Sequence, residues 1–182
     1  PATNMKKLLL ILIIPLFFSC NNEKRILVDE LINNGNKKDP IMYYQGNLFN
    51  GVGFQLNKYA KKEDKDRIIE EAQYKNGKLH GLKTLRYEYA CEEDCLRSET
   101  YYKDGKKNGL HKSYHRNGQI SAEIFFKNGE ENGTGKKYYE NGQLRMTGSM
   151  KNGKPIGLYI FYNENGEIQS EYCYNELGEN IK

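Results

Sequence analysis

Asn-Gly and Asp-Gly dipeptides recur along this chain at a fixed spacing, and that spacing constrains the fold more than any other feature. Matching segments begin at Tyr102, Phe126 and Met150, at intervals of 24 residues. Looser copies begin at Tyr44 and Tyr74, and a truncated copy begins at Tyr174. Self-similarity with a period of roughly 20–50 residues indicates a repeat architecture. The sequence therefore predicts an array of similar units and not a globular enzyme core.

Each repeat contains two turn signals. One series is Asn76-Gly77, Asp104-Gly105, Asn128-Gly129 and Asn152-Gly153, and the other is Asn117-Gly118, Asn141-Gly142 and Asn165-Gly166. Asn-Gly between alternating residues is the strongest short-range hairpin signal, because Asn and Gly tolerate the positive φ that type I′ turns need. We expect two strands of about eight residues in each repeat. The predicted fold is all-β, a single elongated meander of antiparallel β-hairpins.

The strands alternate in a way that predicts one drier face of the sheet. In one repeat the residues expected on that face are Leu110, Tyr114, Ile120, Ala122, Ile124 and Phe126. Tyr114, Tyr138 and Tyr162 occupy one repeat position, so they should form a row. A single-layer sheet must cover such a face by curvature, by a dimer or by a partner, because large apolar patches are uncommon on monomers. We expect Tyr114, Tyr138, Tyr162 and Phe126 to bind a partner. The alternative is that the rings pack only against the array itself.

These motifs resemble a known family. Phe126-Lys127-Asn128-Gly129, Gly133, Tyr138-Tyr139, Asn141-Gly142 and Leu144 are similar to the bacterial variant of the MORN repeat. The resemblance covers about residues 41–182 and implies an array of β-hairpins. Proteins of this type are often described as antitoxin components of toxin–antitoxin systems. MORN-type arrays are associated with protein scaffolding and sometimes with membrane phospholipids.

The N-terminal segment has the pattern of an export signal. Met5-Lys6-Lys7 is a positive start, and Leu8 to Phe18 is an apolar run too short to span a membrane. The run ends at Ser19-Cys20, which resembles a bacterial lipoprotein signal in which the Cys20 thiol carries a diacylglyceryl group. Residues 1–4 precede the plausible start and are interpreted as an upstream extension.

The chain is thus divided into three parts. Residues 1–20 are the predicted signal peptide, residues 21–40 a tether or an N-terminal cap, and residues 41–182 the repeat domain. Arg25 to Ile32 is read as either a short helix or a first capping strand. Lipid attachment at Cys20 would hold the protein on an envelope membrane, since several acyl chains anchor a protein firmly. Asn21-Asn22 carries no evident inner-membrane retention signal, which favours the outer membrane.

Two insertions interrupt the repeats. Lys61 to Arg67 is read as a solvated charged tip, and Tyr89 to Cys95 carries two cysteines around acidic residues. Compartments beyond the inner membrane permit disulfides, so we predict that Cys91 and Cys95 are bonded to each other. Cys173 is then left over and is interpreted as a half-buried free thiol.

The sequence gives no sign of catalysis. None of the G-x-S-x-G, H-E-x-x-H or P-loop patterns is present. His111 and His115 are four residues apart on a predicted strand, but without further ligands they are interpreted as surface residues and not as a metal site. His80 takes a loop position that Asn50, Asn108 and Asn132 take in other copies. The net charge of +4 falls to +2 without Lys6 and Lys7, and no basic stripe indicates nucleic-acid binding.

Three functions remain after these exclusions. The first is a non-catalytic envelope lipoprotein that presents its repeat surface to a protein partner, without cofactor or metal and without binding nucleic acid. The alternative, implied by the family resemblance, is a toxin-neutralising component. A more distant third is a hydrolase acting on glycans or peptides. The predicted signal favours the first over a cytoplasmic antitoxin, and no small-molecule ligand can be named.

Cys20 provides a direct test of the envelope prediction. When the full chain is expressed in bacteria with a radioactive fatty acid, we expect the label to enter the protein and the protein to fractionate with membranes. Cys20→Ala should abolish both. A Cys20→Ala chain that still takes up label and stays in the membrane fraction would contradict lipid attachment at this residue.

Overall fold

The structure is a computed structural model, and it describes residues 24–33, 41–56, 67–88 and 95–181. Cys20 and Cys91 lie outside the described residues, so lipid attachment and the Cys91–Cys95 pair stay predictions. Cys95 and Cys173 are half-buried, and Cys173 forms no disulfide with any of the described residues.

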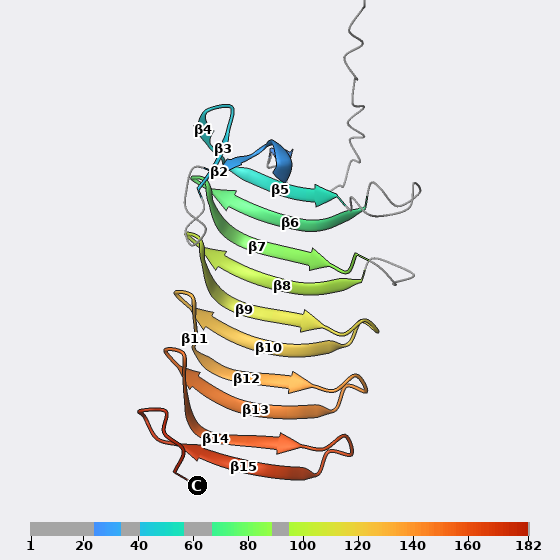
Figure 1. Ribbon diagram of the computed structural model, residues 1–182, viewed down its shortest axis with the longest axis vertical. Coiled ribbons are helices and arrows are strands. Elements are labelled where there is room, and N and C mark those ends of the chain that lie inside the picture. The colour runs from blue at the N-terminus through green and yellow to red at the C-terminus, as the bar shows by residue number, and fades with distance from the viewer. Residues whose placement is uncertain (1–23, 34–40, 57–66, 89–94, 182) are drawn as a thin grey trace, which may run out of the picture.

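The chain forms one long sheet of consecutive hairpins and a small second sheet (Figure 1). The long sheet contains β1 (Arg25–Leu27), β5 (Gly51–Leu56), β6 (Ile68–Lys75), β7 (Lys78–Arg86), β8 (Leu96–Lys103), β9 (Lys106–Tyr114), β10 (Ile120–Lys127), β11 (Glu130–Glu131), β12 (Gly133–Tyr138), β13 (Leu144–Lys151), β14 (Lys154–Tyr162) and β15 (Ile168–Tyr174). From β5 onward neighbouring strands are antiparallel and follow chain order, with β11 as a short extension that pairs with β10. The predicted all-β meander is confirmed.

The N-terminal end of the array holds the most deeply buried cluster. There β1 runs parallel to β5, and η1 (Val28–Glu30) leads into the small sheet of β2 (Ile32–Asn33), β3 (Met42–Tyr44) and β4 (Asn47–Leu48). Ile26, Phe49, Ala72 and Tyr74 are buried together. The segment read as a helix or a strand contains both a strand and a 3₁₀ turn, and Ile26 contributes its side chain to this core.

The two turn series differ in conformation. At Asn76-Gly77, Asp104-Gly105, Asn128-Gly129 and Asn152-Gly153 both residues have positive φ, so these are the predicted type I′ turns. In the other series only the glycines, Gly118, Gly142 and Gly166, have positive φ. The type I′ prediction is therefore wrong for that series. Its loops are longer: the Gly118 amide donates to the His115 carbonyl and the His115 amide to the Gln119 carbonyl, the pattern of a turn followed by a glycine bulge.

A β-bulge follows each of these longer turns. Tyr114 is paired with Ile120, but Ser113 is paired with Ala122, so β10 has one extra residue at this point. The same shift recurs between β12 and β13 and between β14 and β15. Because side chains alternate along a strand, one extra residue moves every later side chain to the other face.

The bulge corrects the predicted faces. Leu110 is paired with Phe125, and His111 with Ile124. We call the side of the sheet that contains Leu110, Tyr114, Glu123 and Phe125 the front face. The opposite side, which contains His111, Ala122, Ile124 and Phe126, is the back face. The expectation that Leu110 and Tyr114 share a face with Ala122, Ile124 and Phe126 was wrong, because alternation was counted through the bulge.

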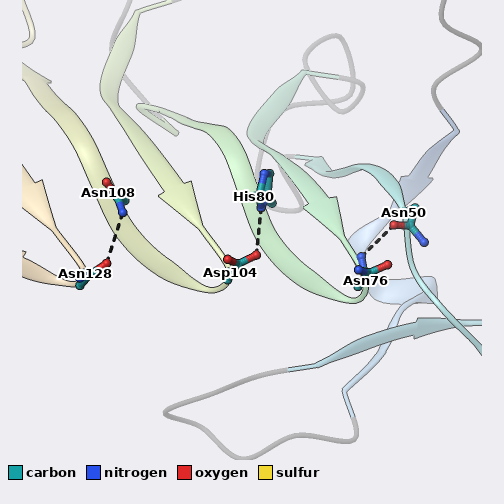
Figure 2. Close-up of polar contacts among 6 residues, drawn as sticks. All are labelled: Asn50, Asn76, His80, Asp104, Asn108 and Asn128. Atoms are coloured by element: carbon teal, nitrogen blue, oxygen red, sulfur yellow. Dashed lines mark hydrogen bonds and ion pairs between the residues drawn. The ribbon is translucent and has the colours of Figure 1, made fainter.

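Hydrogen bonds between successive hairpins join the type I′ turns into a stack. The turn glycine of each hairpin donates its amide to a carbonyl of the preceding hairpin: Gly77 to Phe49 at 2.7 Å, Gly105 to Leu79 at 2.8 Å, Gly129 to Lys107 at 2.8 Å and Gly153 to Glu131 at 3.0 Å. A parallel ladder of side-chain contacts runs beside them (Figure 2). In the first step the Asn76 backbone amide donates to the Asn50 side chain, and the later steps join the side chains of His80 and Asp104, Asn108 and Asn128, and Asn132 and Asn152. His80 therefore replaces an asparagine in one step of this ladder, as its repeat position predicts.

On the back face an aromatic ring lies directly over a glycine. A Cβ atom built on Gly148 would lie 2.4 Å from two carbon atoms of the Tyr159 ring. The ring is held in place because its hydroxyl donates to the Ser149 carbonyl at 2.9 Å and it forms a T-shaped contact with the Tyr174 ring. Gly135 is paired directly with Gly148, yet a Cβ there would meet nothing closer than 3.7 Å.

These two glycines form a matched pair for mutation. Gly148→Ala should destabilise the protein by about 1–3 kcal/mol, the usual cost of overpacking, because the Tyr159 ring must move. Gly135→Ala should be neutral or stabilising by about 0.5 kcal/mol, because alanine restricts the unfolded chain. Urea unfolding of the two variants measures both values. Equal stability of the two variants would show that the ring does not pack over Gly148 as described.

Candidate partner-binding face

The three predicted tyrosines lie on the front face in successive repeats. Tyr114 ends β9, Tyr138 ends β12 and Tyr162 ends β14, each just before one of the longer turns. All three are half-buried. Two of their backbone carbonyls also accept hydrogen bonds from the preceding repeat: the Tyr114 carbonyl from the Tyr87 hydroxyl at 2.8 Å, and the Tyr162 carbonyl from the Tyr139 hydroxyl at 2.7 Å. The row that the 24-residue period predicts is present in the structure.

Two of the tyrosines donate to carboxylates of an earlier strand. The Tyr114 hydroxyl donates to Glu99 at 2.5 Å, and the Tyr138 hydroxyl donates to Glu123 at 3.1 Å. Burial raises the pKa of Tyr114 to about 12, and the hydrogen bond to Glu99 and the charges of Glu99 and Glu123 add to this shift. Burial also raises the pKa of Tyr138, with the bond to Glu123 and its charge as further causes. Both phenols are therefore neutral donors at physiological pH, and their role is to fix the rings against the sheet.

A shallow pocket lies beside Tyr138 on this face. It has a volume of about 340 Å³ and is lined by Leu110, Glu123, Phe125, Thr134 and Lys136. The Lys112 ammonium lies 3.6 Å from the Glu123 carboxylate, so this carboxylate carries both an ion pair and the Tyr138 hydrogen bond. The pocket lining thus combines apolar side chains with charges of both signs. Such a combination suits a protein side chain, since interfaces combine an apolar centre with a polar rim.

Large apolar side chains are exposed on the front face, and one of them, Phe125, lines this pocket. Phe125 is 47% exposed, Tyr101 is 49% exposed and Leu158 is 48% exposed. Tyr101 and Phe125 occupy the same repeat position, and Leu110, the pairing partner of Phe125, is at the repeat position of Leu158. The exposed residues are therefore a consequence of the repeat and form a line along the front face. Sequence reasoning missed Phe125 and the two glutamates, and only the bulge after the longer turn could have revealed them.

Phe126 is separated from the tyrosines by the sheet. On the back face its ring meets His111 edge-to-face, with 6.1 Å between centroids, and the Lys107 ammonium lies 4.7 Å from its centroid. The His111 Nδ1 atom is 2.8 Å from the Thr100 hydroxyl, and burial together with Lys107 lowers the pKa of His111. Phe126 therefore packs among back-face residues, and a partner on the front face does not reach it.

The two neighbouring histidines bind different groups. The His115 Nε2 atom is 3.0 Å from the Tyr138 carbonyl, in the next repeat, whereas His111 contacts Thr100. Within the described ranges, no group of three or more His, Cys, Asp or Glu side chains is arranged to hold a metal ion. No helix in the part of the chain that the structure describes is long and apolar enough to cross a membrane.

Comparison with known proteins identifies the repeat. The MORN repeat variant family matches three segments of this chain, residues 107–128, 131–152 and 155–176. These segments cover β9 to β15, and MORN repeats often mediate protein or membrane interactions. Three successive units of the β-hairpin array are thus similar to the MORN repeat variant.

Other comparisons add little. No curated protein matches the chain. One matching solved structure is a crystal structure of a mutant of S. aureus TarM in complex with Fondaparinux, alpha-GlcNAc-glycerol and UDP. The match has 10% sequence identity and a TM-score of 0.32 over 71% of this chain and 21% of that chain. At this level the likeness carries no argument about activity.

The tyrosine–glutamate bonds can be tested against an internal control. Tyr138→Phe removes the donor to Glu123 and should destabilise the protein by about 1 kcal/mol, less than a fully buried bond to a charged group because the pair is partly solvated. Tyr162→Phe removes a hydroxyl for which no acceptor is found among the described residues, since Thr147 takes the repeat position of Glu123. Its effect should stay within about 0.5 kcal/mol. Thermal unfolding of both variants measures the difference, and an equal loss in the two would rule out a role for the carboxylate.

Proposed function

We propose that this protein is a non-catalytic lipoprotein of the bacterial cell envelope that binds a protein partner through the front face of its MORN array. The observation that carries the proposal is the exposure of Tyr101, Phe125 and Leu158 on the front face, where Phe125 also lines the pocket. A sheet that packs its own core on this face would bury these side chains, and exposed apolar patches are typical of interaction sites.

The polar groups of the front face favour a protein partner over a purely apolar ligand. Glu123 and Lys136 line the same pocket as Phe125 and Leu110. Aromatic side chains contribute most to binding when charged and polar groups surround them and exclude water. The pocket would thus accept one apolar side chain of the partner, while the flat sheet around it supplies the remaining contact area.

The proposed location rests on the N-terminal sequence. A lipid on Cys20 would hold the array at a membrane, with the outer membrane favoured by Asn21-Asn22. The predicted disulfide between Cys91 and Cys95 suits the same oxidising compartment. No cofactor, metal or nucleic acid enters this function.

The test uses the tagged full chain in its own membrane. Phe125→Glu should lower recovery of the partner from solubilised envelopes by roughly tenfold or more, because a central aromatic anchor contributes about 2 kcal/mol or more to binding. Leu177→Glu is the control, since Leu177 is 67% exposed but lies in the turn after β15, away from the pocket. Both variants should keep the melting temperature of the parent. Equal recovery with the two variants would contradict a binding role for the front face.

The toxin-neutralising alternative gives a different result in the same experiment. It requires that the recovered partner arrest growth when it is produced alone, and that co-production of the full chain relieve the arrest. A recovered partner that does not arrest growth when it is produced alone supports the scaffold function.

A further inference from the structure

Asparagine followed by glycine is the sequence in which the side chain is most open to attack by the next backbone nitrogen, because glycine has no side chain to block the approach. Nine asparagines among the described residues precede a glycine. The repeat thus places the same reactive pair in many similar settings. The structure then decides which pair reacts first, through the restraints on the side chain and on the glycine nitrogen.

The three longer turns hold the glycine nitrogen in nearly the same way. The amides of Gly118, Gly142 and Gly166 donate to the carbonyls of His115, Tyr139 and Asn163, at 3.0, 2.9 and 3.0 Å. The attacking atom, the backbone nitrogen of the glycine, is therefore equally available after Asn117, Asn141 and Asn165. Differences among these turns must come from the asparagine side chains.

Two of these side chains are held at both ends. The Asn117 amide donates to the Glu140 carbonyl at 2.7 Å, and its oxygen accepts from the Gln119 amide at 3.0 Å. The Asn141 amide donates to the Glu164 carbonyl at 3.2 Å, and its oxygen accepts from the Gln143 amide at 2.9 Å. Each side chain must break both bonds before its carbonyl carbon can turn toward the glycine nitrogen.

Asn165 has neither restraint. Asn163 stands where His115 and Tyr139 stand in the other turns, and its side-chain oxygen takes the Glu167 amide at 2.9 Å. The backbone amide that bonds to the side-chain oxygen of Asn117 or Asn141 in the other turns therefore bonds to Asn163 here, and not to Asn165. No described residue accepts from the Asn165 side-chain amide, and both Asn165 and Gly166 are exposed. Among the three longer turns, Asn165 is thus the asparagine that combines an exposed glycine with an unrestrained side chain.

The type I′ turns protect their glycine nitrogens differently. The amides of Gly77, Gly129 and Gly153 donate to the preceding hairpin, and Gly77 is buried. The side-chain oxygens of Asn128 and Asn152 also accept from Asn108 and Asn132. No described residue bonds to the Asn76 side chain. The buried Gly77 nitrogen, however, must break its hydrogen bond to the Phe49 carbonyl before it can react, and this separates the two hairpins.

We propose that Asn165 is the preferred site of spontaneous deamidation in the folded protein. The Gly166 nitrogen attacks the Asn165 side-chain carbonyl carbon, a carbon–nitrogen bond forms, and the side-chain nitrogen leaves as ammonia after taking up the glycine proton. Water then opens the succinimide ring at either carbonyl and yields aspartate or isoaspartate. The product adds a carboxylate next to Glu164 and Glu167 and, in the isoaspartyl form, one more methylene in the backbone of the turn.

The test is peptide mapping by mass spectrometry after incubation of the folded protein at mildly alkaline pH. Deamidation at Asn165 should exceed that at Asn141 and Asn117 by about fivefold or more, the factor that corresponds to one net hydrogen bond. In urea, where the turn restraints are lost, the three rates should agree to within about twofold, the scatter that small residual effects of the unfolded chain allow.

Two variants identify the site independently. Asn165→Gln should remove the fast phase of ammonia release from the folded protein, and Asn141→Gln should leave that phase unchanged. Equal rates at Asn165 and Asn141 in the folded protein would overturn the proposal. A fast Asn165 in urea as well would also overturn it, because the preference would then come from the neighbouring residues and not from the turn.

Discussion

The hydrogen bond from each turn glycine to the preceding hairpin is the interaction on which the array depends. A single-layer sheet has little interior, and buried apolar side chains in the described residues cluster at the N-terminal end, around Phe49 and Tyr74. Beyond that end, each hairpin is held by its strand pairing and by the bond that Gly105, Gly129 or Gly153 donates. These turns have positive φ at two successive residues, which explains the return of Asn-Gly or Asp-Gly at residues 76, 104, 128 and 152.

The second type of turn controls which side chains a partner meets. One extra residue follows Gly118 and its equivalents in the next two repeats. It moves the side chains of the rest of each following strand to the opposite face of the sheet. The result is a front face with tyrosine–glutamate pairs and exposed aromatic residues, and a back face on which small residues allow rings to lie close to the backbone, as Tyr159 does over Gly148. The scaffold function that we propose rests on this division, because the back face is closely packed while large side chains are exposed on the front face.

The repeat predicted the fold well and the faces less well. The positions of the hairpins and the type I′ turns follow from the period and from Asn-Gly chemistry, and the row of Tyr114, Tyr138 and Tyr162 follows from the period alone. Asn-Gly also fits a turn with a glycine bulge, so sequence could not distinguish the two turn types. The consequence was the placement of Phe126 with the tyrosines, when the register puts Phe125 on their face. The sequence also did not reveal Glu99 and Glu123 as partners of Tyr114 and Tyr138, because the bulge decides which side chains of neighbouring strands share a face.

Native-state hydrogen exchange by NMR tests the central role of the turn glycines most directly. The amides of Gly105, Gly129 and Gly153 should be strongly protected and should exchange only when neighbouring hairpins separate, because each is bonded to the preceding hairpin. Gly46 is the internal reference, since it has the same positive φ in a type I′ turn but no backbone bond to another hairpin. Its amide should exchange close to the rate of a free peptide. Exchange of Gly129 and Gly153 as fast as that of Gly46 would contradict the account.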